Sequence, residues 1–224
     1  MLKSSWIVFK KDVKIEMKSR VLAFQVLPLA GAVLIIFGFA LGPDNQVLSR
    51  AAPGLVWITI LLVSLLAVTR SIAIEDEIGA DGIRLFGIDP GGLYLGKTMA
   101  ATIQVFLIGV VIIFSSAAIF NSGFSDILSI LAMVLGGFLA VGALCSAGIL
   151  FGMMSLASNV RETLLPLLFL PVAAPVVLAA TKVSVPALGG SKASILEWLG
   201  VLAVLFIAYL SVGTVVSESL LEEN

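Results

Sequence analysis

The chain has 224 residues, of which 60% are hydrophobic and 12% charged, and its mean hydropathy is +1.17. Soluble domains are about 45–50% apolar and about 25% charged, so the excess apolar surface here must face lipid. The net charge of −1 excludes the basic surface of a nucleic-acid-binding protein. The absence of histidine excludes imidazole catalysis and histidine ligation of zinc or haem. The sequence therefore predicts an all-α integral membrane protein.

Six uncharged apolar stretches reach the length of about 20 residues that a membrane-spanning helix needs. Together they form a predicted six-helix transmembrane domain over residues 21–217. The predicted spans are residues 21–43, 51–69, 98–120, 127–153, 163–181 and 198–217. Six spans place both termini on one side of the membrane. All basic residues except Arg50, Lys182 and Lys192 lie on that side, so the positive-inside rule predicts that both termini are cytoplasmic.

Residues 1–20 are predicted to form an amphipathic cytoplasmic helix that lies in the headgroup layer and also anchors the topology. Five lysines occupy the surface that the apolar side chains leave free. The apolar stripe consists of Leu2, Trp6, Phe9, Val13 and Met17. We expect Trp6 from this helix, and Trp57 near the outer end of the second span, to be membrane-interface aromatics.

The spans contain no residue that suggests catalysis or metal binding. No Asp, Glu, Lys or Arg lies in the middle of any span, which disfavours coupling to an ion gradient and intramembrane hydrolysis. The single cysteine, Cys145, lies in an apolar stretch and is interpreted as a small buried hydrophobic residue. We therefore predict no catalytic residues and no metal ligands.

Two spans have unusual packing residues. In the fourth, Gly148 and Gly152 form a small-xxx-small pair that favours close helix packing within one bundle over a dedicated dimer motif. In the fifth, Pro166, Pro171 and Pro175 predict a bent or broken helix. Discontinuous helices often line transport paths, but proline also occurs in many ordinary membrane helices, so both interpretations of this span stay open.

Residues 91–98 match the phosphate-binding pattern G-x-x-x-x-G-K-S/T. The context does not fit, because a P-loop joins a buried strand to a soluble helix, whereas this segment follows Asp89 and Pro90 and enters a span. We interpret Gly91 and Gly92 as a turn and expect Lys97 to snorkel to the cytoplasmic interface.

The predicted cytoplasmic loop, residues 71–97, contains an acidic cluster that departs from the positive-inside trend. The cluster could be a solvated surface or a docking surface for a soluble partner. Docking is favoured because the apolar Ile83, Leu85 and Phe86 would then be covered. The residues assigned to this coupling surface are Glu75, Asp76, Glu77, Gly79, Asp81, Gly82 and Arg84.

Three stretches resemble the haem exporter B (CcmB) family of ABC-transporter permeases, within the wider ABC-2 exporters. Residues 52–57, APGLVW, resemble the family's entry into the second span. Residues 75–82, together with YLGK at 94–97, are similar to its acidic, glycine-punctuated cytoplasmic segment. Residues 167–176, LLFLPVAAPV, resemble its proline-containing span. The chain departs from the family's pattern at Arg84, Ile88 and Asp89.

The resemblance implies a permease subunit in the inner membrane of a prokaryote, without an ATPase site of its own. A separate cytoplasmic ATP-binding subunit would energise it. We expect this subunit to dock on the amphipathic helix and the loop 71–97. Further haem-handling membrane subunits would act with it in haem export for c-type cytochrome maturation. In that system haem would be a substrate of the complex, and this chain alone would bind no cofactor.

Two other functions stay open at this stage. A generic ABC-2 exporter of a lipid, drug or glycan would share the six-span design without needing haem. A non-transporting membrane scaffold of a cytochrome biogenesis complex would use the same partners but move no substrate through these spans.

Overall fold

The computed structural model describes residues 2–20, 22–42, 44–85, 89–120, 126–155, 161–188 and 194–222. Within these ranges, the side chains of residues 2, 22–23, 75–85, 161–164 and 220–222 are outside the description. All regular elements of the described part are helical, which confirms the predicted all-α class. The elements are α1 (Leu2–Ser19), a short π-helix η1 (Leu22–Val26), α2 (Leu27–Leu41), α3 (Asn45–Leu85), α4 (Pro90–Ile119), α5 (Ile127–Ser155), α6 (Arg161–Ser184) and α7 (Ile195–Glu222).

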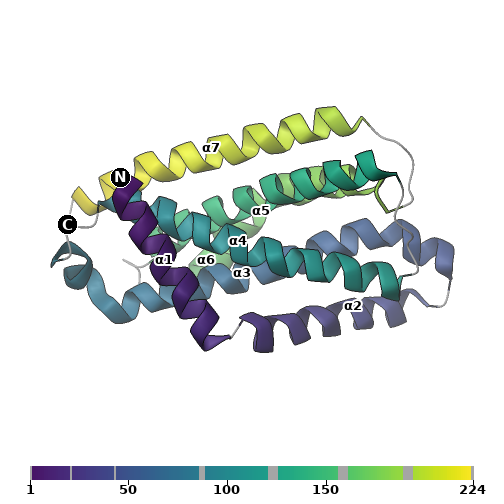
Figure 1. Cartoon of the computed structure of the whole chain (residues 1–224), viewed down its shortest axis with the longest axis horizontal. Coiled ribbons are helices and arrows are strands. Elements are labelled where there is room, and N and C mark those ends of the chain that lie inside the picture. The colour runs from purple at the N-terminus through teal and green to yellow at the C-terminus, as the bar shows by residue number, and fades with distance from the viewer. Residues whose placement is uncertain are drawn as a thin grey trace.

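Six helical stretches are long and apolar enough to cross a membrane, which confirms the predicted number of spans. They cover Phe24–Leu41, Asn45–Ile74, Pro90–Ile119, Ile127–Ser155, Leu165–Ser184 and Ile195–Ser219. Helices α2 to α7 run side by side along the long axis of the molecule, and both termini lie at the same end (Figure 1). This arrangement is the one expected for an even number of crossings.

Helix α5 is the centre of the bundle and packs against α3, α4, α6 and α7. Every residue from Ala140 to Leu150 is buried. Six of these eleven are Gly, Ala or Ser: Ala140, Gly142, Ala143, Ser146, Ala147 and Gly148. Small side chains allow neighbouring helices to approach closely. At Gly142, for example, an added Cβ would lie 2.7 Å from the Phe206 ring of α7.

The junction between α2 and α3 follows from turn and capping residues. Helix α2 ends before Gly42, whose φ of 77° is a left-handed conformation that glycine adopts without strain. Asp44 then caps α3, because its Oδ1 accepts a hydrogen bond of 2.8 Å from the backbone N–H of Gln46. This junction agrees with the predicted end of the first span.

Helix α1 is oriented differently from the six spans. It lies on the flank of the bundle and crosses α4 near the end that holds both termini (Figure 1). The turn after α1 is made by Arg20, a non-glycine residue with a φ of 51°. The change in chain direction between α1 and α2 is therefore concentrated at this residue and the following π-helix.

Candidate coupling site

The contact between α1 and α4 is built around a glycine. A Cβ added to Gly96 of α4 would lie 2.6 Å from the Ser5 carbonyl oxygen and 2.7 Å from Val8 Cβ, both in α1. Real Cβ atoms do not approach other atoms so closely. Gly96 therefore lets the two helices lie almost in backbone contact, and Val8 is buried there.

Lys97, the next residue of α4, joins three helices. Its side chain is 1% exposed, and its Nζ lies 3.2 Å from Oδ2 of Asp12 in α1. The same Nζ donates to the carbonyl oxygen of Ser71 in α3 at 2.9 Å and to the Ser71 Oγ at 3.2 Å. The prediction that Lys97 snorkels to the interface is therefore wrong. Helix α1 covers this side chain, and Asp12 supplies a counter-charge that makes its burial tolerable.

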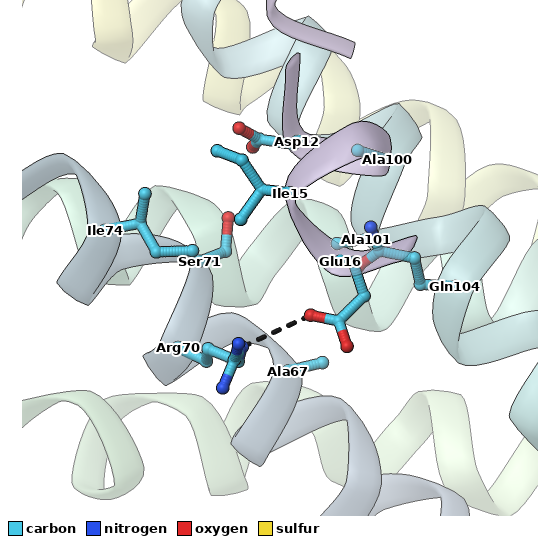
Figure 2. A pocket seen from close by; sticks show the side chains of 10 residues that line it. All are labelled: Asp12, Ile15, Glu16, Ala67, Arg70, Ser71, Ile74, Ala100, Ala101 and Gln104. Atoms are coloured by element: carbon cyan, nitrogen blue, oxygen red, sulfur yellow. Dashed lines mark ion pairs between the residues drawn. The ribbon is translucent and has the colours of Figure 1, made fainter. Parts of the chain in front are cut away.

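A second ion pair lies beside the first. Arg70 of α3 has its Nε 3.2 Å from Oε2 of Glu16 in α1, and its Nη2 donates to Ser19 Oγ at 3.0 Å. Figure 2 shows Asp12, Glu16, Arg70 and Ser71 around a small cavity, with the Arg70–Glu16 pair dashed. The cavity volume is about 20 Å³, close to the space of one water molecule. We call Asp12, Glu16, Arg70, Ser71 and Lys97 the α1 clamp.

The α1 clamp was not among the predicted sites, although the sequence carries a signal for it. Asp12 and Glu16 are the only acidic residues of α1, and their spacing of four places them on one face of the helix. Ser5 and Val8, which with Asp12 are the buried residues among the described side chains of α1, continue that face. Two acids on one side of an otherwise basic helix could have predicted cationic partners in the bundle.

The nucleotide-binding interpretation of residues 91–98 fails in the structure, as expected from its context. The whole segment lies in the first turns of α4, with Pro90 at the first position and Asp89 as the N-cap. Asp89 Oδ2 accepts from the backbone N–H of Gly92 at 3.0 Å. Gly91 and Gly92 are therefore helical and not the predicted turn, and the lysine of the motif belongs to the α1 clamp.

The predicted loop 71–97 is helical over most of its length. Helix α3 continues to Leu85 and α4 begins at Pro90, so the predicted secondary structure of this segment, a loop, is wrong. The continuation of α3 projects beyond α1 at the end of the bundle that holds both termini (Figure 1). Its backbone carries all predicted coupling residues, whose side chains lie outside the description: Glu75, Asp76, Glu77, Gly79, Asp81, Gly82 and Arg84. Their role stays a prediction.

Helix α6 contains all three prolines and is one uninterrupted helix from Arg161 to Ser184. The expected break is absent, whereas a bend stays a prediction. Pro166 is half-buried, and Pro171 and Pro175 are exposed on the surface of the bundle. Tyr209 of α7 donates to the carbonyl oxygen of Val172 at 3.0 Å, so a neighbouring helix stabilises the proline-containing stretch. Whether these prolines line a substrate path stays a prediction.

The small-xxx-small pair of α5 lies at the contact with α3. A Cβ added to Gly148 would lie 2.7 Å from Val68 Cγ2, and one added to Gly152 would lie 2.5 Å from Ile72 Cγ1. Both glycines therefore pack inside this bundle. The two contacted residues of α3, Val68 and Ile72, flank Arg70 and Ser71 of the α1 clamp.

The two tryptophans predicted at membrane interfaces have different surroundings. Trp57 is 1% exposed, and its Nε1 donates to Ser184 Oγ at 2.8 Å, which links α3 to the end of α6. Its side chain therefore contacts helices and not lipid headgroups. Trp6 is 51% exposed, stacks on Phe9 with ring centroids 5.2 Å apart, and has Lys10 Nζ 5.2 Å from its ring centroid.

The α1 clamp joins α1, α3 and α4 through two ion pairs and the hydrogen bonds of Lys97 to Ser71. Among the described residues, no group of three or more His, Cys, Asp or Glu side chains is placed to hold a metal ion. The clamp instead ties α1 to the cytoplasm-proximal ends predicted for α3 and α4.

Comparison with known proteins gives a consistent family assignment. The family described as CcmB protein matches residues 3–224. Heme exporter protein B of Escherichia coli K12 is 28% identical over 96 residues, which is 42% of this chain and 44% of the relative. Heme exporter protein B of Shigella flexneri matches with the same values. The alignments thus span less than half the length of these curated relatives. Since the family match extends over nearly the whole sequence, the chain belongs to the CcmB family.

Proposed function

We propose that this chain is a membrane permease subunit of an ABC transporter that exports haem for the maturation of c-type cytochromes. Its membership of the CcmB family and the names of its relatives support haem as the substrate. The six apolar spans support a role within the membrane. A separate ATP-binding subunit energises transport, and haem-handling membrane subunits complete the complex.

The proposed orientation places both termini in the cytoplasm of a prokaryotic cell. Arg70 and Lys97 pair with α1, which lies near the end of the bundle that holds the termini. Arg50 lies near the start of α3 and Lys182 near the end of α6. This distribution supports the positive-inside assignment made from the sequence.

The ATP-binding subunit docks on the continuation of α3 beyond the α1 clamp. A single observation carries this proposal: α3 extends as a helix past the last residue of its apolar span, Ile74, to Leu85. That extension carries the acidic cluster, which fits a basic surface on the partner. Movement of the extension then reaches α1 and α4 through Ser71 and Arg70.

Charge reversal tests the docking site. We expect Glu77→Lys to abolish co-purification of the ATP-binding subunit and its permease-stimulated ATPase activity, while membrane insertion is unchanged. Glu218→Lys is the matched control. Glu218 is an exposed acid near the C-terminal end of α7, and that end of α7 lies at the same end of the bundle as the α3 continuation. Equal activity of the Glu77 and Glu218 variants would contradict the proposed docking site.

The substrate is tested separately from docking. ATPase activity of the purified complex should rise on addition of haem, and an absorption spectrum of the native complex should contain a Soret band. Stimulation by lipids, drugs or glycans without any response to haem would contradict haem export, even if docking at Glu77 were established.

A further inference from the structure

The charges of α1 are sorted between its two faces. Both acidic residues, Asp12 and Glu16, turn toward the bundle and pair with Lys97 and Arg70. These are the only acids of α1, so its outward face carries cationic and no anionic side chains. The exposed residues of α1 with described side chains are Lys3, Trp6, Ile7, Lys10, Lys14, Met17, Lys18 and Ser19.

The outward face combines two parallel ridges. Phe9, Val13 and Met17 recur every four residues and form an apolar ridge. Lys10, Lys14 and Lys18 have the same spacing and form a basic ridge beside it. The six side chains line one shallow surface groove, which we call the α1 outer groove.

The apolar stripe predicted from the sequence is not the surface that binds the bundle. Helix α1 packs on α4 through Ser5, Val8 and Asp12, which leaves Trp6 and Met17 exposed. An apolar ridge next to a lysine ridge matches the boundary between acyl chains and phosphate groups, because lysine stems lie along apolar surface while their ammonium groups reach polar surroundings.

The position of α1 on the bundle suits the same boundary. It lies on the flank of the spans near one end, and not over the end of the bundle (Figure 1). The α3 continuation projects past it and is better placed to meet a soluble protein. The side of α1 turned away from the bundle is therefore placed to face the headgroups of the adjacent leaflet.

We propose that the α1 outer groove binds anionic phospholipid. Lys10, Lys14 and Lys18 contact lipid phosphates, and Phe9, Val13 and Met17 insert among the upper acyl chains. A net negative headgroup is favoured over a zwitterionic one because no acid on this face offsets the lysines. The proposal concerns lipid binding by this chain and does not depend on which substrate the complex transports.

The test uses the full chain in nanodiscs that contain phosphatidylglycerol and phosphatidylcholine, one of which is brominated. Bromine on a neighbouring lipid quenches tryptophan fluorescence, and Trp6 lies beside the groove, stacked on Phe9. We expect brominated phosphatidylglycerol to quench at least about twofold more strongly than brominated phosphatidylcholine at equal mole fraction, with the excess decreasing at high salt. The excess should disappear in Trp6→Phe, which identifies its source.

Two double variants of equal charge loss provide the decisive comparison. Lys14→Gln with Lys18→Gln should reduce the quenching ratio to about one, since the anionic preference requires the lysines. Arg50→Gln with Lys182→Gln removes two exposed basic residues at the other end of the spans and should keep the wild-type ratio.

Three outcomes would overturn the proposal. One is equal quenching by both lipids in the wild-type chain, and another is an equal loss of preference in both double variants. The third is an unchanged lipid preference in the Lys14 and Lys18 variant, which would show that these lysines do not select the lipid. None of these readouts involves haem or ATP hydrolysis, so the result is independent of the proposed transport function.

Discussion

Lys97 and Asp12 are 85 positions apart in the sequence, yet Lys97 Nζ lies 3.2 Å from Asp12 Oδ2 in the interior of the protein. The pair fixes the position of α1 on α4, and the bonds from Lys97 to Ser71 extend the attachment to α3. Composition alone predicts that α1 is peripheral, but these contacts make it part of the bundle.

Substitution of Lys97 should destabilise the protein strongly. In Lys97→Met the Asp12 carboxylate stays buried without this partner, and removal of one member of a buried pair costs about 3–5 kcal/mol. We expect a loss of about 3 kcal/mol in the free energy of unfolding, measured by titration with SDS in mixed micelles. Replacing both members, by Asp12→Leu with Lys97→Met, should restore much of this stability because no isolated charge is left.

Lys11 offers the control for the Lys97 variant. It also lies near Asp12, with Nζ 3.4 Å from Oδ1, but its side chain is 34% exposed and can be solvated. Lys11→Met should therefore leave the unfolding transition nearly unchanged. A loss as large as that of Lys97→Met would show that proximity to Asp12, and not burial of the pair, determines the effect.

A methyl group at Gly96 should displace α1. In Gly96→Ala the new Cβ would approach the Ser5 carbonyl oxygen, which is backbone and can move only if the whole helix moves. Overpacking of this kind costs about 1–3 kcal/mol. The undocked population of α1 should rise at least about fivefold, and tryptic cleavage after its lysines should accelerate in proportion.

The matched substitution is Gly54→Ala, because a Cβ at Gly54 meets nothing within 4 Å. This variant should show the wild-type cleavage pattern. If Gly96→Ala were cleaved no faster than Gly54→Ala, close contact at Gly96 would not be what holds α1 in place.

The sequence was sufficient to predict the six spans and the position of both termini at one end of the bundle, because the spans depend on local composition and the termini on an even number of crossings. The α1 clamp depends instead on where α1 lies after folding, and composition does not encode that position. Lys97 illustrates the difference: a lysine next to a span is normally expected to reach the interface, but here another helix covers it and supplies Asp12. Trp57 is a similar case, because it was expected at the membrane interface but its indole N–H donates to Ser184 inside the bundle.

Replacing Gly152 with a larger residue should destabilise the protein. A leucine there would overlap Ile72 of α3, since even a Cβ would lie 2.5 Å from Ile72 Cγ1. We expect Gly152→Leu to lower the free energy of unfolding by about 3 kcal/mol or to prevent folding. Gly31→Leu in α2, where a Cβ would meet nothing within 4 Å, should unfold like the wild type. Equal stability of the two variants would contradict the tight packing of α5 on α3.

The hydrogen bond between Trp57 and Ser184 should contribute measurably to the attachment of α6 to α3. Ser184→Ala leaves the buried indole N–H without this acceptor, and a buried unsatisfied donor costs about 1–3 kcal/mol. Thr181→Ala is the control, because Thr181 Oγ1 donates only within α6, to the Val177 carbonyl oxygen at 2.8 Å. Ser184→Ala should lower the free energy of unfolding more than Thr181→Ala.

In a Trp57→Phe background the Ser184→Ala substitution should cost about 1 kcal/mol less, because the indole donor is gone. An identical cost in both backgrounds would mean that Ser184 acts through its bond to the Ala180 carbonyl oxygen and not through Trp57.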